Sequence, residues 1–251
     1  MSKGILILAS NTDDVDYVSM AKSTAERASD VLQIPNTVID LGEIHEKNMR
    51  LNLDNDSMVQ WNNKNRFTVI DYTPYDDTLV IDSDFIVNTR NFLNIFNLEF
   101  DYLLSKNFTT VGDDIDNNIN KTGLKYLWAT AFVFRKTKTT QLFFKLVRRI
   151  QSNWEYYRML YNIEDRNFRN DIAFTLADSI LHGYNISKNV LPHSLTHVTV
   201  PNVSIQPYDD FGFVVRGEGR RPVIIPKVDL HILSKSFFTT QEFKDLLNVK
   251  P

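Results

Sequence analysis

Two aspartates one residue apart, Asp82 and Asp84, directly follow an apolar, strand-forming run at residues 78–81. The chain turns apolar again at residues 85–87. A carboxylate at the end of a buried strand is unfavourable unless a cation, backbone donors or water compensate its charge. The pair therefore predicts a partner. A hard divalent cation such as Mn²⁺ or Mg²⁺ is one candidate, because it prefers oxygen ligands and keeps positions open for phosphates; a solvated turn is the alternative.

The composition limits the kinds of site that the chain can build. It contains no cysteine, which excludes disulfides, zinc–thiolate sites and thiol nucleophiles. It has only eight glycines and neither a GxxxxGKS/T nor a GxGxxG phosphate loop. A net charge of −3 gives no global attraction to nucleic acid, although a local basic face is compatible with it. A bound nucleoside diphosphate would therefore have to be neutralised by a metal ion or by side chains.

The first forty residues predict a βαβ unit. Residues 5–9 form an apolar run, residues 15–32 carry apolar side chains at helical spacing, and residues 36–42 predict a second strand. Such a unit favours a parallel sheet whose ligands lie at the carboxyl ends of the strands, where Ser10 and Asn11 are expected. The opening apolar run is too short for a secretory signal or a membrane span, so we expect a cytoplasmic protein.

The remaining pattern predicts one α/β domain. Residues 43–64 are polar and without a clear period, and predict a loop with a short helix near 56–61. No repeat or linker interrupts the chain, and the C-terminal portion, beyond residue 183, predicts irregular short strands and turns. Further strands are expected at 66–71, 78–81, 85–87, 107–112 and 126–134, and helices at 90–100, 139–161, 171–181 and 240–248.

Four segments together resemble the GT-A nucleotide-sugar glycosyltransferases. These segments are PYDDTLVIDSDFIV (74–87), WATAFVFRKTKTTQLFFKLV (128–147), FRNDIAFTLA (168–177) and VDLHILSK (228–235). The resemblance implies a GT-A-like (Rossmann-like) mixed sheet flanked by helices and a single domain over 1–251. Residues 1–110 would form the half that binds the nucleotide sugar, and residues 111–251 the acceptor-side half.

The resemblance also implies roles for individual residues. It makes Asp82, Asp84 and His231 ligands of Mn²⁺ or Mg²⁺, with Asp82 also part of the donor-binding site and Lys235 a contact of the diphosphate. Asp171 would be the acidic catalytic residue beside the sugar or acceptor. Ser10, Asn11 and Arg66 would contact the nucleoside, and Trp128 the sugar.

Four of these residues also have a purely structural interpretation. His231 lies in an apolar strand, where a hydrogen-bonded core histidine is common. Asp171 stands at a helix start, where the helix dipole favours a carboxylate. Lys235 would be a surface charge, and Trp128 a core residue.

The chemistry implied is metal-dependent transfer of a sugar from a nucleoside-diphosphate sugar, expected to be a UDP-sugar, to a hydroxyl group. The metal and Lys235 would stabilise the departing diphosphate electrostatically. In an inverting reaction Asp171 would deprotonate the acceptor hydroxyl; in a retaining reaction it would only position the sugar. The sequence leaves both open.

The acceptor is suggested by a basic turn and by a second resemblance. Arg216, Arg220 and Arg221 lie in RGEGRRP, a turn that would contact phosphates of a polyanionic acceptor or simply form a solvated face. The Asn-, Asp- and Phe-rich, glycine-poor style resembles proteins of T-even-like bacteriophages, some of which transfer glucose or arabinose to 5-hydroxymethylcytosine. This resemblance implies double-stranded DNA as the acceptor, with the base reached in the major groove or flipped out.

Two other functions use the same residues. In a haloacid-dehalogenase-like phosphatase Asp82 would be the nucleophile and Asp84 the acid, but Ile86 occupies the place where that family has Thr or Val, and a whole βαβ unit precedes the pair. In a non-catalytic binding protein the site would hold a nucleotide without turnover.

Overall fold

The central feature is a five-stranded mixed sheet with the strand order β2-β1-β5-β9-β7. The computed structural model describes residues 1–42, 49–60, 64–115, 118–119, 124–185 and 187–249. β1 pairs in parallel with β2 and β5, and β9 runs antiparallel to β5 and β7. The mixed α/β sheet flanked by helices that the sequence predicts is confirmed. The strands are β1 (Lys3–Ala9), β2 (Asn36–Asp40), β5 (Asp77–Ile81), β7 (Tyr102–Ser105) and β9 (Trp128–Arg135).

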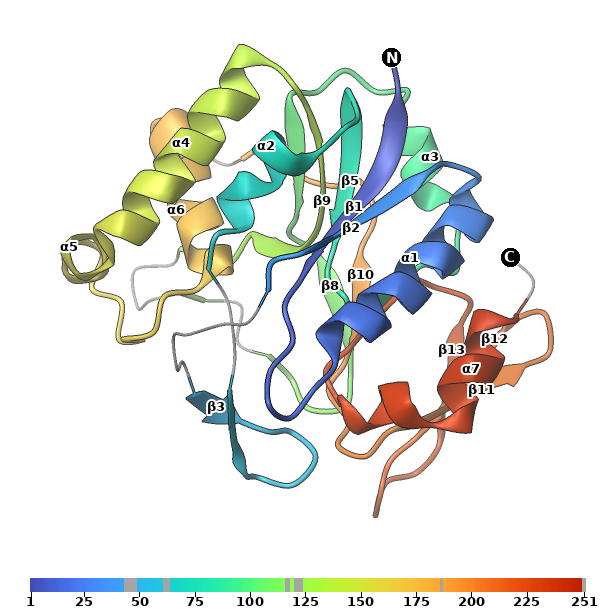
Figure 1. Ribbon diagram of the computed structural model, residues 1–251. Coiled ribbons are helices and arrows are strands. Elements are labelled where there is room, and N and C mark those ends of the chain that lie inside the picture. The colour runs from blue at the N-terminus through green and yellow to red at the C-terminus, as the bar shows by residue number, and fades with distance from the viewer. Residues whose placement is uncertain (43–48, 61–63, 116–117, 120–123, 186, 250–251) are drawn as a thin grey trace.

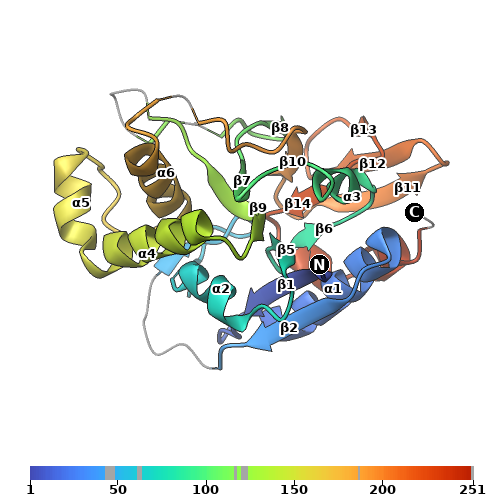
Figure 2. The same ribbon diagram turned by 90° about the horizontal axis from the view of Figure 1, so that it is seen from above.

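Helices cover both faces of this sheet, because alternate side chains of its strands are apolar on both sides. Leu6, Val80 and Phe132 pack with α4 and α6, whereas Ile5 and Leu79 pack with α1 and α3. Figure 1 shows α2, α4 and α6 on one side of the sheet and α1 and α3 on the other, and Figure 2 gives the view from above. The helices are α1 (Tyr17–Leu32), α2 (Val69–Tyr72), α3 (Asn91–Ile95), α4 (Lys138–Ser152) and α6 (Asn170–Leu181).

Smaller sheets complete the fold. A four-stranded sheet has the order β6-β14-β10-β8, with β6 antiparallel to β14 and the other pairs parallel. The C-terminal portion is more regular than predicted, because β11, β12 and β13 form an antiparallel sheet that packs on α7 around an apolar core of its own. The added elements are β3 (Met49–Leu51), β4 (Met58–Gln60), β6 (Phe85–Ile86), β8 (Phe108–Val111), β10 (Leu195–Val198), β11 (Ser204–Tyr208), β12 (Gly212–Arg216), β13 (Val223–Pro226), β14 (Leu230–Ile232) and α7 (Gln241–Leu247).

Three element predictions were wrong. The strand expected at 66–71 is a 3-10 turn (Arg66–Thr68) followed by α2, and its apolar side chains pack on the α4 side of the core instead of joining a sheet. The short helix expected near 56–61 is the strand β4, with position 61 outside the described residues. The single helix expected at 139–161 is divided into α4 and α5 (Trp154–Leu160) at Asn153, whose side chain bonds the Arg149 carbonyl (2.8 Å) and ends the first helix.

In the part of the chain that the structure describes, no helix is long and apolar enough to cross a membrane.

Candidate functional site

The aspartate pair lies where the chain leaves the first sheet for the second. The Asp82 N–H donates to the Thr130 carbonyl (2.9 Å), which continues the pairing of β5 with β9. The Ile232 N–H donates to the Asp84 carbonyl (3.0 Å), which begins the pairing with β14. Between them, the Phe85 N–H bonds the Asp82 carbonyl (3.1 Å) and closes a turn. Both carboxylates are therefore carried on backbone that is fixed from either side.

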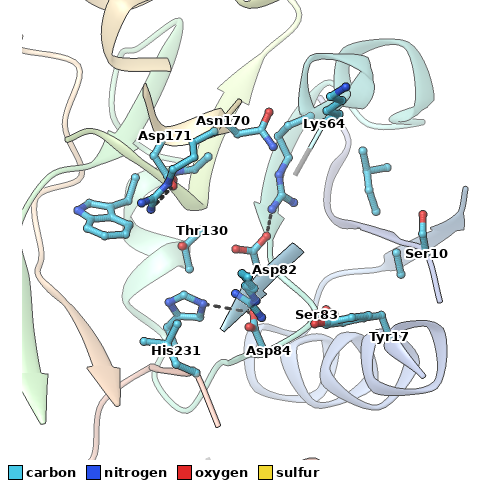
Figure 3. A pocket seen from close by; sticks show the side chains of 18 of the residues that line it. Ser10, Tyr17, Lys64, Asp82, Ser83, Asp84, Thr130, Asn170, Asp171 and His231 are labelled. Carbon is cyan, nitrogen blue, oxygen red and sulfur yellow. Dashed lines mark hydrogen bonds and ion pairs between the residues drawn. The ribbon is translucent and has the colours of Figure 1, made fainter. Parts of the chain in front are cut away.

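His231 completes a cluster with the two aspartates. The antiparallel register of β6 and β14 sets His231 opposite Phe85, directly after Asp84. Ligand atoms of Asp82, Asp84 and His231 all lie within 4.8 Å of one another, and His231 Nε2 is 3.3 Å from Asp84 Oδ1. Figure 3 shows the three side chains converging. Two carboxylates and an imidazole are a donor set that suits Mn²⁺ or Mg²⁺, so these residues fit a divalent cation.

Lys235 is the direct charge partner of Asp84. Its Nζ forms an ion pair with Asp84 Oδ2 and also donates to the Ile232 carbonyl (3.2 Å), and both residues are buried. Burial alone would raise the pKa of Asp84, but Lys235 and His231 hold that pKa well below its usual range. The carboxylate is therefore charged and compensated by cations. The interpretation of Asp84 as part of a solvated turn was wrong, and so was that of Lys235 as a surface charge.

Arg66 is the charge partner of Asp82. Its Nη2 forms an ion pair with Asp82 Oδ1, and the side chain is mostly buried. Burial lowers the pKa of Arg66 to about 10, and the nearby carboxylates of Asp171 and Asp84 oppose this shift. The guanidinium therefore stays charged at neutral pH and holds Asp82 from the side of the turn before α2.

One cavity unites these groups at the carboxyl ends of β1 and β5, where a parallel sheet is expected to bind its ligand. In Figure 3 Asp171 and Asn170 lie on the opposite side of Thr130 from Asp84 and His231. Among the residues that the structure describes, those that line the cavity are Leu8, Ala9, Ser10, Thr12, Tyr17, Leu41, Arg50, Lys64, Arg66, Asp82, Ser83, Asp84, Trp128, Ala129, Thr130, Arg169, Asn170, Asp171, His231, Leu233 and Lys235.

The structure brings together most of the residues nominated from the sequence. Ser10, Arg66, Asp82, Asp84, Trp128, Asp171, His231 and Lys235 all line the cavity. Trp128 is also packed among other rings, with its centroid 5.2 Å from that of Phe108 and 5.3 Å from that of Tyr126, so it is both core and cavity wall.

Four nominated residues lie outside the cavity lining. The Asn11 side chain accepts the Val18 N–H (2.9 Å) at the start of α1. Arg216, Arg220 and Arg221 are exposed at the end of β12 and in the turn after it. There Arg216 donates to Gln206 (2.6 Å), and Arg220 donates to both carboxylate oxygens of Asp113 (2.8 and 2.9 Å).

Asp171 links α6 to β9. Its Oδ1 accepts the Ala129 N–H (2.8 Å), and Arg169 Nη2 lies 3.3 Å from its Oδ2. The first bond reaches across to the neighbouring strand instead of capping the helix that carries Asp171. A carboxylate has about four lone-pair positions, so Asp171 retains the capacity to accept a substrate hydroxyl.

We expect Asp171→Ala to lower the free energy of unfolding by about 1–3 kcal/mol, because the buried Ala129 N–H would lose its acceptor. Asp171→Asn keeps an acceptor oxygen and should cost less than the alanine variant. Urea unfolding of both variants would measure the difference. Equal stability of Asp171→Ala and the wild type would show that this bond does not hold α6 on the sheet.

Several lining residues had not been nominated. Arg169 lies two residues before Asp171 in the chain, and its guanidinium sits over the ring of Tyr126 (5.2 Å). Its position at the same helix start was a signal that could have been used. Arg50 and Lys64 also line the cavity. They come from the polar segment without periodicity, where no pattern marks one residue over another.

A second histidine lies behind His231. The Nδ1 atoms of His197 and His231 are 2.9 Å apart, and His197 is fully buried. Burial lowers the pKa of His197 well below its usual range, so this ring is neutral and carries a single N–H.

No protein-family model and no curated protein matches the chain. Among solved structures, the chain is similar to a complex of the galactosyltransferase LgtC with donor and acceptor sugar analogues, at 11% identity over 99% of this chain and 97% of that one, with a TM-score of 0.49. An active-site mutant of LgtC has 14% identity over 75% of this chain and 80% of that one, with a TM-score of 0.42. A glycosyltransferase involved in glycosylation of the major capsid of PBCV-1 has 10% identity over 79% of this chain and 82% of that one, with a TM-score of 0.39. With TM-scores below 0.5, these similarities leave the function to be inferred from the site.

Proposed function

We propose that this chain is a metal-dependent GT-A-type glycosyltransferase that moves a sugar from a nucleoside-diphosphate sugar, a UDP-sugar, to an acceptor hydroxyl. The observation that carries the proposal is the convergence of Asp82, Asp84 and His231 with the ammonium of Lys235 in one cavity. A cation held by three protein ligands beside a fixed positive side chain is what a diphosphate requires in a chain without a glycine-rich phosphate loop.

Asp82, Asp84 and His231 would hold Mn²⁺ or Mg²⁺, which when bound supplies positive charge to the departing diphosphate. Lys235 would exchange its contact with Asp84 for one with a phosphate oxygen. Asp82 would also belong to the donor-binding site. The bond between the anomeric carbon and the diphosphate breaks as the acceptor oxygen bonds that carbon. Asp171 would lie by the sugar or acceptor: in an inverting reaction it would take the hydroxyl proton, and in a retaining reaction it would position the sugar.

The remaining cavity residues would position the donor. Ser10, at the end of β1, and Arg66 would contact the nucleoside, and Trp128 the sugar. Asn11 lies outside the cavity lining, between the lining residues Ser10 and Thr12, and would contribute its backbone, since its side chain is bonded at the start of α1. In this arrangement residues 1–110 carry the donor half and residues 111–251 the acceptor-side half, with His231 and Lys235 crossing back to the donor.

For the acceptor we propose 5-hydroxymethylcytosine in phage DNA, modified with arabinose or glucose in the host cytoplasm. The support is the exposed basic turn with Arg216, Arg220 and Arg221, whose place outside the cavity suits contacts with phosphates that flank a bound base. The hydroxymethyl group would be reached from the major groove or after base flipping.

The test is a thermal-shift panel of nucleotide sugars with and without Mn²⁺. A donor at a hundredfold excess over its Kd stabilises the native state by about 2.7 kcal/mol, so one nucleotide sugar should raise the Tm by several degrees only when Mn²⁺ is present. The donor identified in this way is then used with hydroxymethylated and unmodified duplexes. The absence of a shift with any nucleotide, together with phosphate release from an aryl phosphate, would replace the proposal with the phosphatase function. A metal-dependent shift without any transfer would favour a binding protein.

A further inference from the structure

His197 and His231 stand side by side on neighbouring strands. β10 and β14 are parallel, and their register pairs these two residues. The ring centroids are 4.8 Å apart, and the only polar contact between the rings joins their Nδ1 atoms at 2.9 Å. On its other sides His197 packs on Phe108 (4.8 Å) and Trp128 (5.0 Å). Its ring is therefore buried between the His231 imidazole and the rings of Phe108 and Trp128, and Trp128 also lines the cavity.

A hydrogen bond between two Nδ1 atoms has two possible directions. If His231 keeps its proton on Nε2, that N–H points to Asp84 Oδ1, and His231 Nδ1 accepts a proton from His197. If His231 offers the Nε2 lone pair to a metal, its proton must be on Nδ1, and His197 Nδ1 must be the acceptor. Only the second direction allows a neutral His231 to act as a ligand.

We propose that His197 is a positioning residue, which fixes the ring and the tautomer of His231 for metal binding by accepting the His231 Nδ1–H. The inference rests on the proposed metal-dependent function. A ligating histidine usually donates its second N–H to a protein group, and here the neighbouring Nδ1 takes that place.

A second observation supports this role. His197 Nε2 is buried and has no hydrogen-bond partner within the described part of the chain. An unpaired ring nitrogen in an apolar site is unfavourable, and a phenylalanine in its place would avoid that penalty. A histidine at this position therefore requires a function for its other nitrogen, and the contact with His231 supplies one.

The test compares Mn²⁺ affinity, measured from the electron paramagnetic resonance signal of free Mn²⁺ without nucleotide, in three variants at position 197. His197→Phe keeps a ring but removes the acceptor, and should weaken binding about 10–100-fold. His197→Asn places an oxygen near the position of Nδ1, so its Mn²⁺ affinity should stay within about threefold of the wild type. His197→Gln places its amide nearer the position of Nε2, so its Mn²⁺ affinity should fall as much as that of the phenylalanine variant.

The control is His193→Phe, at a half-buried histidine whose Nε2 atom is buried. His193 Nε2 also lacks a partner among the residues described, and its ring packs on Phe92 (4.9 Å) away from the cavity lining, so Mn²⁺ affinity should not change. Melting curves of all variants separate loss of folding from loss of binding. In ¹⁵N-histidine spectra with Mg²⁺, His231 should show the Nδ1–H tautomer and His197 the Nε2–H tautomer.

Wild-type affinity in all three variants at position 197, equal losses in the asparagine and phenylalanine variants, or the opposite tautomers would overturn the inference. A wild-type protein that binds neither Mn²⁺ nor Mg²⁺ would instead remove the proposed metal-dependent function, and this inference with it.

Discussion

Replacing Asp84 with asparagine is expected to lower kcat/KM for metal-dependent transfer by about a thousandfold or more, because a neutral amide oxygen replaces the anionic metal ligand and the site loses the charge that orders it. Asp84 is buried, and it contacts Lys235 through one oxygen and His231 through the other. Asparagine keeps the size of the side chain, and the hydrogen bond from Ile232 to the backbone of residue 84 remains. The loss should therefore come from charge and not from shape. Initial rates at saturating Mn²⁺ would measure it.

The same substitution should destabilise the metal-free protein by about 3–5 kcal/mol, because the buried ammonium of Lys235 loses its counter-charge. Adding Lys235→Met to Asp84→Asn should restore much of this stability without restoring transfer. Asp77→Asn is the matched control: Asp77 is a buried aspartate paired with Arg135 (3.1 Å) outside the cavity lining, so its loss should reduce stability while kcat/KM is retained. Transfer at the wild-type rate by Asp84→Asn would contradict the assignment of this carboxylate to the metal.

The aspartate pair could be predicted from the sequence because its signal is local. The apolar run before it and the apolar residues after it predicted two strands, and β5 and β6 are those strands. The unfavourable burial of charge then required a partner. The structure supplies cationic partners, Lys235 for Asp84 and Arg66 for Asp82.

The partners themselves depend on contacts that no local pattern encodes. His231 reaches Asp84 through the register of β14 with β6, and Lys235 lies 151 residues from Asp84 in the chain. Both were nominated only through the resemblance to glycosyltransferases. Arg66 was nominated within a predicted strand, but it begins a 3-10 turn. Its alternating apolar neighbours fit either structure, and tertiary packing decided between them.

His197 is a candidate site residue that the sequence pattern did not mark. His197 was not among the residues nominated from the sequence, because a histidine in an apolar strand has no distinguishing pattern. Its contact with His231 exists because β10 and β14 are parallel and in register. In the chain, all three strands of the β11–β13 sheet lie between them. Arg216, Arg220 and Arg221 formed a clear local signal, yet the fold leaves them outside the cavity lining.

Lys235→Met is expected to separate metal binding from catalysis. In the metal-free protein the Lys235 ammonium occupies Asp84 Oδ2, so it competes with a divalent cation for the same carboxylate. Removing this charge should tighten Mn²⁺ binding without nucleotide by about tenfold, since a like charge only a few ångströms from the ion is unfavourable. Transfer should nevertheless fall by about 10²–10³-fold in kcat, because the departing diphosphate loses a fixed positive group.

Lys235→Arg and Lys244→Met serve as the controls for this prediction. The arginine variant keeps the positive charge, so its Mn²⁺ affinity should stay near that of the wild type while it recovers part of kcat. Lys244 is an exposed lysine in α7, and its replacement should change neither quantity. Calorimetric titration with Mn²⁺ and initial rates with the identified donor measure the two effects on the same preparations. Weaker Mn²⁺ binding by Lys235→Met would mean that the lysine supports the metal site rather than competing for it. An unchanged kcat would mean that the diphosphate leaves without help from Lys235.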